Sequence, residues 1–130
     1  MSTLRVNTIQ NTSGVEVFTA KAWVNFDGTG TASANQTVRA SGNVSSVFKN
    51  GTGDYTVNFT SAMADANYAV TLGYANTTGS STANYGFGVR APTSNGVGQT
   101  SLTTTSVRVT LRSSAGNAND ADHLTVAIFR

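Results

Sequence analysis

Residues 43–59, with the sequence NVSSVFKNGTGDYTVNF, constrain the fold more than any other part of the chain. Apolar and polar residues alternate in both halves. Successive side chains of a strand point to opposite sides, so this pattern buries one face of each half. Between the halves lies Asn-Gly-Thr-Gly at 50–53, and Asn and Gly tolerate the positive φ angles of tight turns. The stretch therefore predicts an antiparallel hairpin. The side chains predicted to share a face are Val44, Ser46 and Phe48 in the first strand and Tyr55, Val57 and Phe59 in the second.

Short alternating runs recur along the chain, with polar or glycine-rich segments between them. Charged residues are only 11% of the sequence, so the polar surface must come from Ser, Thr, Asn and Gly, which suit strands and turns better than helices. Short strands at this spacing are typical of antiparallel sandwiches and barrels. We therefore predict an all-β protein: an antiparallel β-sandwich or barrel-like domain at residues 21–130, preceded by a short N-terminal β segment at residues 1–20. Besides the hairpin, strands are expected at residues 4–9, 15–18, 37–41, 68–74, 85–90, 101–112 and 124–130.

The same alternation predicts the core. Trp23 is interpreted as a core or subunit-interface aromatic, and Met63 as tucked inward from a compact connection. Leu102 is out of phase with the apolar residues that follow it, which a bulge near residues 104–106 would explain. The two glycines within residues 85–90 indicate a bulge or the close approach of another backbone. The side chains predicted to contribute to the core are Tyr55, Val57, Phe59, Val70, Leu72, Val126 and Ile128.

Several functional classes have no support in the sequence. The net charge is +2 and the basic residues are spread along the chain, so no nucleic-acid partner is expected. No run approaches the roughly 20 apolar residues of a membrane span, and the first ten residues do not resemble a signal peptide. The glycines form no phosphate-binding loop, and no cofactor is expected. The chain contains no cysteine, so its stability must come from packing or from oligomerisation.

No catalytic or metal site is predicted either. The only histidine, His123, follows Asp120 and Asp122 in a polar segment, but residues so close in a loop seldom orient one another as a catalytic triad requires. Residues 117–122 have a weak similarity to a calcium loop, although turn chemistry explains their Asn and Asp residues as well. Carboxylates beside turns usually accept hydrogen bonds from their own backbone, and three are interpreted in this way: Asp27, Asp54 and Asp65.

Candidate binding residues border the later loops. A flat aromatic side chain beside polar donors can stack on a sugar ring and bind its hydroxyl groups, and loops on a rigid β scaffold are where binding residues usually lie. Phe87 lies among these residues but is assigned to sheet packing. The candidate receptor-binding residues are Tyr74, Tyr85, Arg90, Arg112 and His123.

Parts of the chain resemble the receptor-facing domain of tail-fibre proteins from tailed bacteriophages, notably those of cyanobacteria and marine bacteria. The resemblance rests on KAWVNFDGTGT at 21–31, on residues 43–70, and on the ending LTVAIFR at 124–130. More weakly, STLRVNTIQNTSG at 2–14 resembles the start of short fibre shafts. Membership would imply a homotrimer in the virion tail, made in the host cytoplasm, that recognises a host receptor. The N-terminal segment would then join the copies or attach to baseplate or tail proteins.

Three functions remain open at this point. The first is a tail-fibre or fibre-tip protein that recognises the host surface, with a glycan as the expected receptor. The second is a virion assembly or decoration protein that binds other virion proteins. The third is a small glycan hydrolase, which the absence of a catalytic constellation disfavours. No enzymatic activity is expected.

Overall fold

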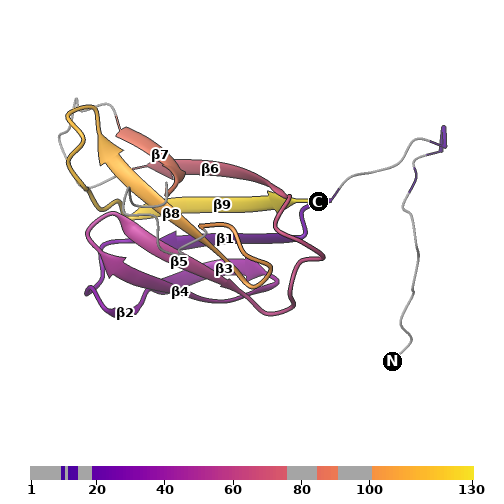
Figure 1. The fold of residues 1–130 in the computed structure, drawn as a ribbon, viewed down its shortest axis with the longest axis horizontal. Helices are drawn as coiled ribbons and strands as arrows, with labels where there is room; N and C mark the ends of the chain where they lie inside the picture. The colour runs from indigo at the N-terminus through magenta and orange to yellow at the C-terminus, as the bar shows by residue number, and fades with distance from the viewer. Residues whose placement is uncertain (1–9, 11, 15–18, 76–84, 91–100) are drawn as a thin grey trace.

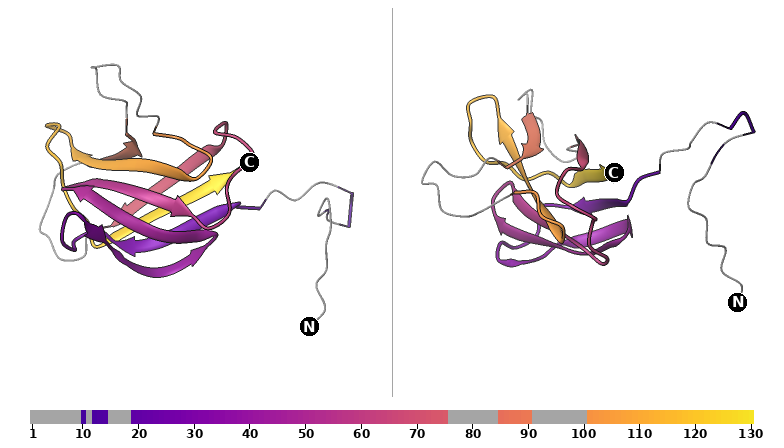
Figure 2. Two further views of the ribbon diagram at one scale, coloured as in Figure 1. Left: turned by 60° about the horizontal axis from the view of Figure 1, so that its bottom comes forward. Right: turned by 45° about the vertical axis from the view of Figure 1, so that its right-hand side comes forward.

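Two antiparallel sheets face each other in this protein, as the sequence predicted (Figure 1). The computed structural model describes residues 10, 12–14, 19–75, 85–90 and 101–130, and these residues contain strands and turns but no helix. The first sheet has the strand order β3-β1-β9-β6 and the second β2-β4-β5-β8-β7. Figure 2 shows the two layers from two further directions. The strands are β1 (Ala22–Asp27), β2 (Ala34–Asn35), β3 (Thr37–Gly42), β4 (Val44–Gly51), β5 (Asp54–Phe59), β6 (Ala69–Ala75), β7 (Tyr85–Val89), β8 (Ser106–Ser113) and β9 (His123–Phe129).

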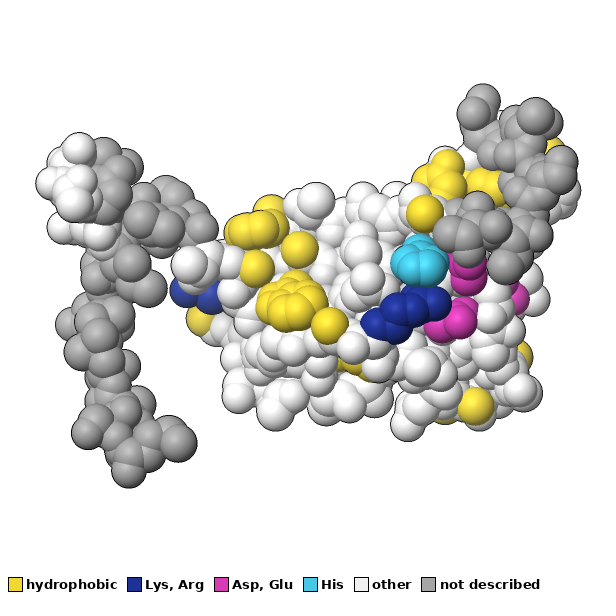
Figure 3. All heavy atoms as spheres, turned by 180° about the vertical axis from the view of Figure 1, so that it is seen from behind, with side chains coloured by type: hydrophobic (Ala, Val, Ile, Leu, Met, Phe, Trp, Pro, Cys, Tyr) yellow, Lys and Arg dark blue, Asp and Glu magenta, His cyan; other side chains and the backbone are white. Residues whose placement is uncertain are grey.

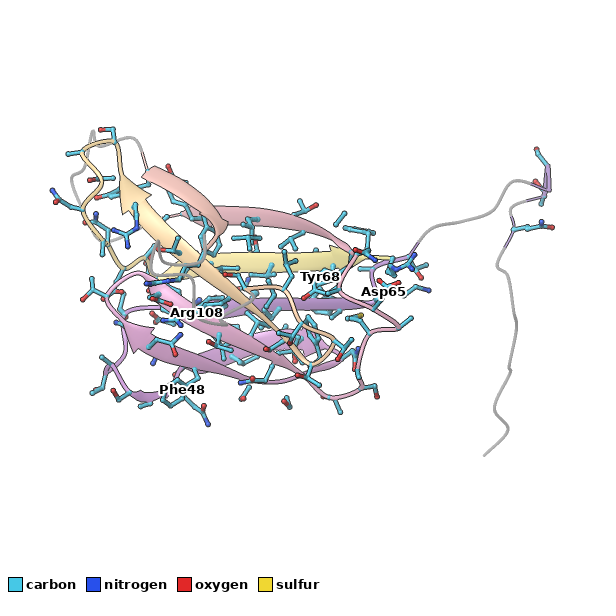
Figure 4. All side chains as sticks on the ribbon, viewed as in Figure 1. Phe48, Asp65, Tyr68 and Arg108 are labelled. Atoms are coloured by element: carbon cyan, nitrogen blue, oxygen red, sulfur yellow. The ribbon has the colours of Figure 1, made fainter. Side chains whose placement is uncertain are left out.

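The core lies between the sheets and is built by inward side chains of alternating phase. Tyr55 and Phe26 pack edge to face at its centre, with ring centroids 5.3 Å apart. Tyr68 closes one side of the core, where its hydroxyl lies 2.9 Å from the carbonyl oxygen of Thr103 (Figure 4). The prediction for β5 and β9 is confirmed, because Tyr55, Val57, Phe59, Val126 and Ile128 are all buried. Val70 and Leu72 are partly buried and pack against this core, and Met63 is buried as expected.

The facing predicted for β4 is wrong in its second half. Val44 packs partly against the core, but Val47 and Lys49 are buried, whereas Phe48 is 36% exposed. The pairing of β4 with β5 shifts between Val44 and Ser46, and an extra residue in one strand reverses the direction of every side chain after it. The irregularity therefore moves Phe48 to the outer face.

Residues 101–107 form a tight turn in place of the predicted bulge. Leu102 pairs with Val107 in an isolated bridge, and the Thr103 amide donates a hydrogen bond to the Ser106 carbonyl at 3.0 Å. The Thr103 hydroxyl accepts hydrogen bonds from the amides of Thr105 and Ser106. The chain reverses its direction between Leu102 and Val107. This turn, and not an inserted residue, explains why Leu102 is out of phase with the apolar residues of β8.

The glycines of β7 also differ from the expectation. Gly86 and Gly88 pair in continuous register with Arg112 and Thr110, and an added Cβ at Gly88 would meet no atom within 4 Å. They mark neither a bulge nor a close backbone approach.

The segments predicted at 4–9 and 15–18 lie outside the described residues. The described chain enters β1 at the end of the sandwich where the C-terminus also lies (Figure 1). At that end Arg130 and Asp65 form an ion pair, with Arg130 Nε 2.9 Å from Asp65 Oδ1. Within the described part of the chain, no helix is long and apolar enough to span a membrane.

Candidate functional site

The structure brings two of the five predicted binding residues together. Tyr74 on β6 and Tyr85 on β7 contact each other edge to face, with ring centroids 5.8 Å apart. The Tyr74 hydroxyl lies 3.1 Å from the Tyr85 carbonyl oxygen and 3.2 Å from its amide nitrogen. These contacts join the edges of the two sheets, so the pair has a structural role.

Arg90 belongs to an ion-pair cluster with Asp54. Arg108 binds the same carboxylate in a bidentate manner, with Nε 2.8 Å from Oδ1 and Nη2 2.9 Å from Oδ2, and Arg90 contacts Oδ2. Burial alone would raise the pKa of Asp54, but the hydrogen bonds and charge of Arg108 and the charge of Arg90 outweigh it and hold the pKa below its usual value. Asp54 therefore binds arginines from β8 and from the end of β7, not its own backbone as predicted.

The last two predicted residues have separate surroundings. Arg112 donates a hydrogen bond to the Gly116 carbonyl at 2.9 Å, which closes the turn after β8. His123 begins β9, and its Nδ1 lies 3.7 Å from Asp122 Oδ1. The five predicted residues therefore do not converge on one site in the described structure.

The calcium-like segment is used for internal contacts. Asp120 Oδ2 lies 2.7 Å from the ammonium of Lys49, and Asp120 Oδ1 accepts hydrogen bonds from the Gly53 amide at 2.8 Å and the Tyr55 hydroxyl at 2.7 Å. Among the described residues, no group of three or more His, Cys, Asp or Glu side chains could hold a metal ion. The predictions for Asp27 and Asp65 are confirmed, since each accepts a hydrogen bond from the amide two residues later.

A hollow on the outer face of the four-stranded sheet is the stronger candidate site. It has a volume of about 490 Å³ and lies across β1, β9 and β6. We call it the Trp23 groove. Figure 3 views the molecule from the side opposite to Figure 1 and shows hydrophobic side chains beside a group of basic, acidic and histidine side chains. The groove is lined by Trp23, Val24, Asn25, Thr71, Leu72, Gly73, Thr125, Val126 and Ala127.

The register of the three strands explains the shape of the groove. Ala127 on the central strand is the cross-strand partner of both Trp23 and Thr71. Two residues earlier on β9, Thr125 is the cross-strand partner of both Asn25 and Gly73. The floor of the groove therefore consists of the small side chains on β9 and the glycine on β6. The larger indole of Trp23, which is 43% exposed, projects beside this floor.

The position of the indole is fixed by Gly42 on β3. A Cβ atom at Gly42 would lie 2.4 Å from Trp23 Nε1, so the ring packs directly over the glycine and one side of it borders the groove. Because the side chain of Trp23 is exposed, the core alternative for this residue is wrong, whereas the subunit-interface alternative stays a prediction. The sequence contains the signal that would have corrected it, because Val24 and Phe26 share the inward phase of β1 and Trp23 has the opposite phase.

An ion pair borders the groove next to Asn25. Arg39 Nη1 lies 3.5 Å from Asn25 Oδ1, and Arg39 Nη2 lies 3.4 Å from Asp27 Oδ2. The pKa of Asp27 is lowered, mainly because the Thr29 hydroxyl donates a 2.6 Å hydrogen bond to its carboxylate. The groove therefore offers an aromatic ring, an amide and hydroxyl groups, with a charge-balanced pair at its rim. This set suits the binding of a polar ring that has one apolar face.

Comparison with known proteins gives one match. No family model matches the chain, and no curated protein matches its sequence. Among solved structures, the chain is similar to the phiAB6 tailspike, whose crystal structure contains three-repeated oligosaccharides of Acinetobacter baumannii surface polysaccharide. The match has 17% sequence identity and a TM-score of 0.49, and it covers 99% of this chain and 28% of the tailspike chain. This protein therefore spans less than a third of the length of that neighbour.

Proposed function

We propose that this protein is a receptor-binding subunit of a bacteriophage tail fibre and that it binds host-surface glycan in the Trp23 groove. The observation that carries the proposal is the exposed Trp23 indole beside Asn25, Thr71 and Thr125 on the outer face of a paired sheet. A sugar ring presents C–H groups on its faces and hydroxyl groups around its edge. The indole can cover such a face, while the amide and hydroxyl groups bind the edge.

The resemblance of the sequence to phage fibre domains supports the proposed role in a tail fibre. The segment at 21–31, which resembles the opening of phage fibre domains, contains Trp23 itself and supplies β1. The segment at 43–70 supplies β4 and β5 and the start of β6, which carries Thr71. The proposal keeps a glycan as the receptor but moves its site from the loops to the face of a sheet.

Binding without catalysis is part of the proposal. Within the described residues, the carboxylates of Asp27, Asp54, Asp65 and Asp120 form ion pairs with basic side chains, and all four lie outside the groove lining. A glycosidase needs two carboxyl groups flanking the scissile bond. Incubation with a bound polysaccharide should therefore release no new reducing ends. Release by the parent protein, lost in Asp27→Asn or His123→Ala, would contradict this part of the proposal.

The test of the site compares two exposed aromatic residues on opposite sheets. Trp23→Ala should weaken binding to host cells or purified surface polysaccharide by at least about 30-fold, as expected for a central anchor residue worth about 2 kcal/mol. Phe48→Ala is the matched control, since Phe48 is 36% exposed on the outer face of the other sheet, and it should change the affinity by less than about twofold. Equal affinities of parent and Trp23→Ala would refute the site.

A second candidate function is assembly with other copies of the chain or with tail proteins. It is favoured by another exposed aromatic residue on the same sheet, Phe129 at 38%, at the end where the chain enters β1. Light scattering should give about three times the 13.4 kDa chain mass for a closed trimer, and deletion of residues 1–20 should weaken it if that segment joins the copies. If Trp23→Ala dissociates the trimer, the groove is a subunit interface. If the trimer persists while glycan binding is lost, the groove is the receptor site.

A further inference from the structure

We infer that the Trp23 groove selects an uncharged sugar unit, a neutral pyranose, over uronic, sialic or phosphorylated sugars. This inference names the ligand class of the site and rests on the proposed glycan binding. It follows from the lining, from the ion pair at the rim and from the width of the groove.

The lining contains an aromatic ring and neutral polar groups, but it contains no positively charged side chain that could pair with an acidic ligand. Its polar side chains are the amide of Asn25 and the hydroxyl groups of Thr71 and Thr125, and the remaining lining residues are apolar or glycine. A carboxylate or phosphate that enters a site loses water, and neutral hydrogen-bond donors replace only part of that solvation. A sugar hydroxyl loses far less and can both donate and accept hydrogen bonds here.

The arginine at the rim does not supply the missing charge. Arg39 Nη2 lies 3.4 Å from Asp27 Oδ2 and Arg39 Nη1 lies 3.5 Å from Asn25 Oδ1, so the guanidinium already has a carboxylate beside it. Asp27 is itself held by the Thr29 hydroxyl at 2.6 Å and is therefore a fixed anion beside the guanidinium. An acidic ligand that approaches Arg39 meets this carboxylate as well, so attraction and repulsion oppose each other at the rim.

The geometry fits a single ring. Ala127 lies between Trp23 and Thr71, so the backbones of the two outer strands are two strand spacings apart, about 10 Å. A ring seated over Ala127 would have the indole on one side and the Thr71 hydroxyl on the other. Thr125 donates a hydrogen bond to the Gly73 carbonyl at 3.3 Å, which leaves its hydroxyl oxygen as an acceptor toward the ligand.

The test uses pairs of polysaccharides that differ only in charge: bacterial surface polysaccharides that contain uronic acid, and the same polymers after their uronic carboxyl groups have been reduced to alcohols. Each is titrated against the parent, Trp23→Ala and Thr71→Lys. The parent should bind the neutral member of a pair at least about tenfold more tightly, and its Kd should change less than about twofold between 50 and 500 mM NaCl. Thr71→Lys adds a cation to the wall and should shift the preference toward the acidic member.

The outcomes separate this inference from the proposed function. Tighter Trp23-dependent binding of the acidic member, with a Kd that rises steeply with salt, would overturn the neutral preference and leave the glycan site in place. Binding that is unchanged in Trp23→Ala, or no binding to any member by the parent, would overturn the proposed site and the inference with it. Preference for the neutral member that depends on Trp23 and shifts toward the acidic member in Thr71→Lys supports both.

Discussion

Replacement of Asp120 by Ala should destabilise the protein by about 3 kcal/mol, because it removes one partner of a buried ion pair. Lys49 is only 3% exposed. Its ammonium has three acceptors: the carbonyl oxygens of Gly28 at 3.0 Å and Gly30 at 2.7 Å, and Asp120 Oδ2 at 2.7 Å. The variant keeps the two carbonyl groups but leaves the positive charge inside the protein without an anion.

The size of the loss follows from the exposure of the two partners. Breaking a buried pair costs about 3–5 kcal/mol. The Asp120 side chain is 26% exposed, so water can partly replace it, and the lower end of the range applies. The variant also leaves the Gly53 amide without the oxygen that accepts its hydrogen bond at 2.8 Å. For a chain of this size the melting temperature should fall by roughly 10 °C.

Lys49→Met should cost less, about 1 kcal/mol, although it removes the same ion pair. Methionine fills a similar volume without a charge. Asp120 would keep the Gly53 amide and the Tyr55 hydroxyl as donors and is partly solvated. Urea unfolding followed by circular dichroism would measure both variants and their double mutant. Equal losses of unfolding free energy in Lys49→Met and Asp120→Ala would contradict the argument that an unpaired charge costs more at the buried Lys49 than at the partly exposed Asp120.

Two further predictions concern the same hairpin. Gly53 has a φ of +60°, and a Cβ there would lie 2.4 Å from a backbone carbonyl oxygen, so Gly53→Ala should lower the free energy of unfolding by more than about 2 kcal/mol. Gly51→Ala, where a Cβ meets nothing within 4 Å, should change it by less than about 0.5 kcal/mol, and equal effects would contradict this explanation. The pKa of Asp54 is lower in the folded chain than in the unfolded chain, so its stabilisation is present above about pH 4 and is lost as the pH falls toward the folded pKa. In urea unfolding at a series of pH values, Asp54→Asn should therefore show a weaker acid dependence than the parent between about pH 5 and pH 2, and parallel curves would refute the ion-pair argument.

The sequence by itself determined the strands whose side chains alternate without interruption. The inward residues of β5 and β9 were predicted correctly. In a strand with one buried face, apolar residues recur at every second position, and this period can be read directly from the sequence. The glycine-rich turn between β4 and β5 was also predictable, because positive φ angles require particular residues locally. The all-β class followed from these local signals.

Only the tertiary structure decided where the phase breaks and which distant residues meet. The irregularity after Val44 exposes Phe48, and nothing in the local pattern separates it from continued alternation. The ion pair between Lys49 and Asp120 joins residues 71 positions apart, so its partners are chosen by the packing of a hairpin against a later loop. The Trp23 groove has the same origin. The outward phase of Trp23 was present in the sequence, but a hollow exists only because the register of three strands sets small residues beside it, and register is a property of paired strands, not of any one of them.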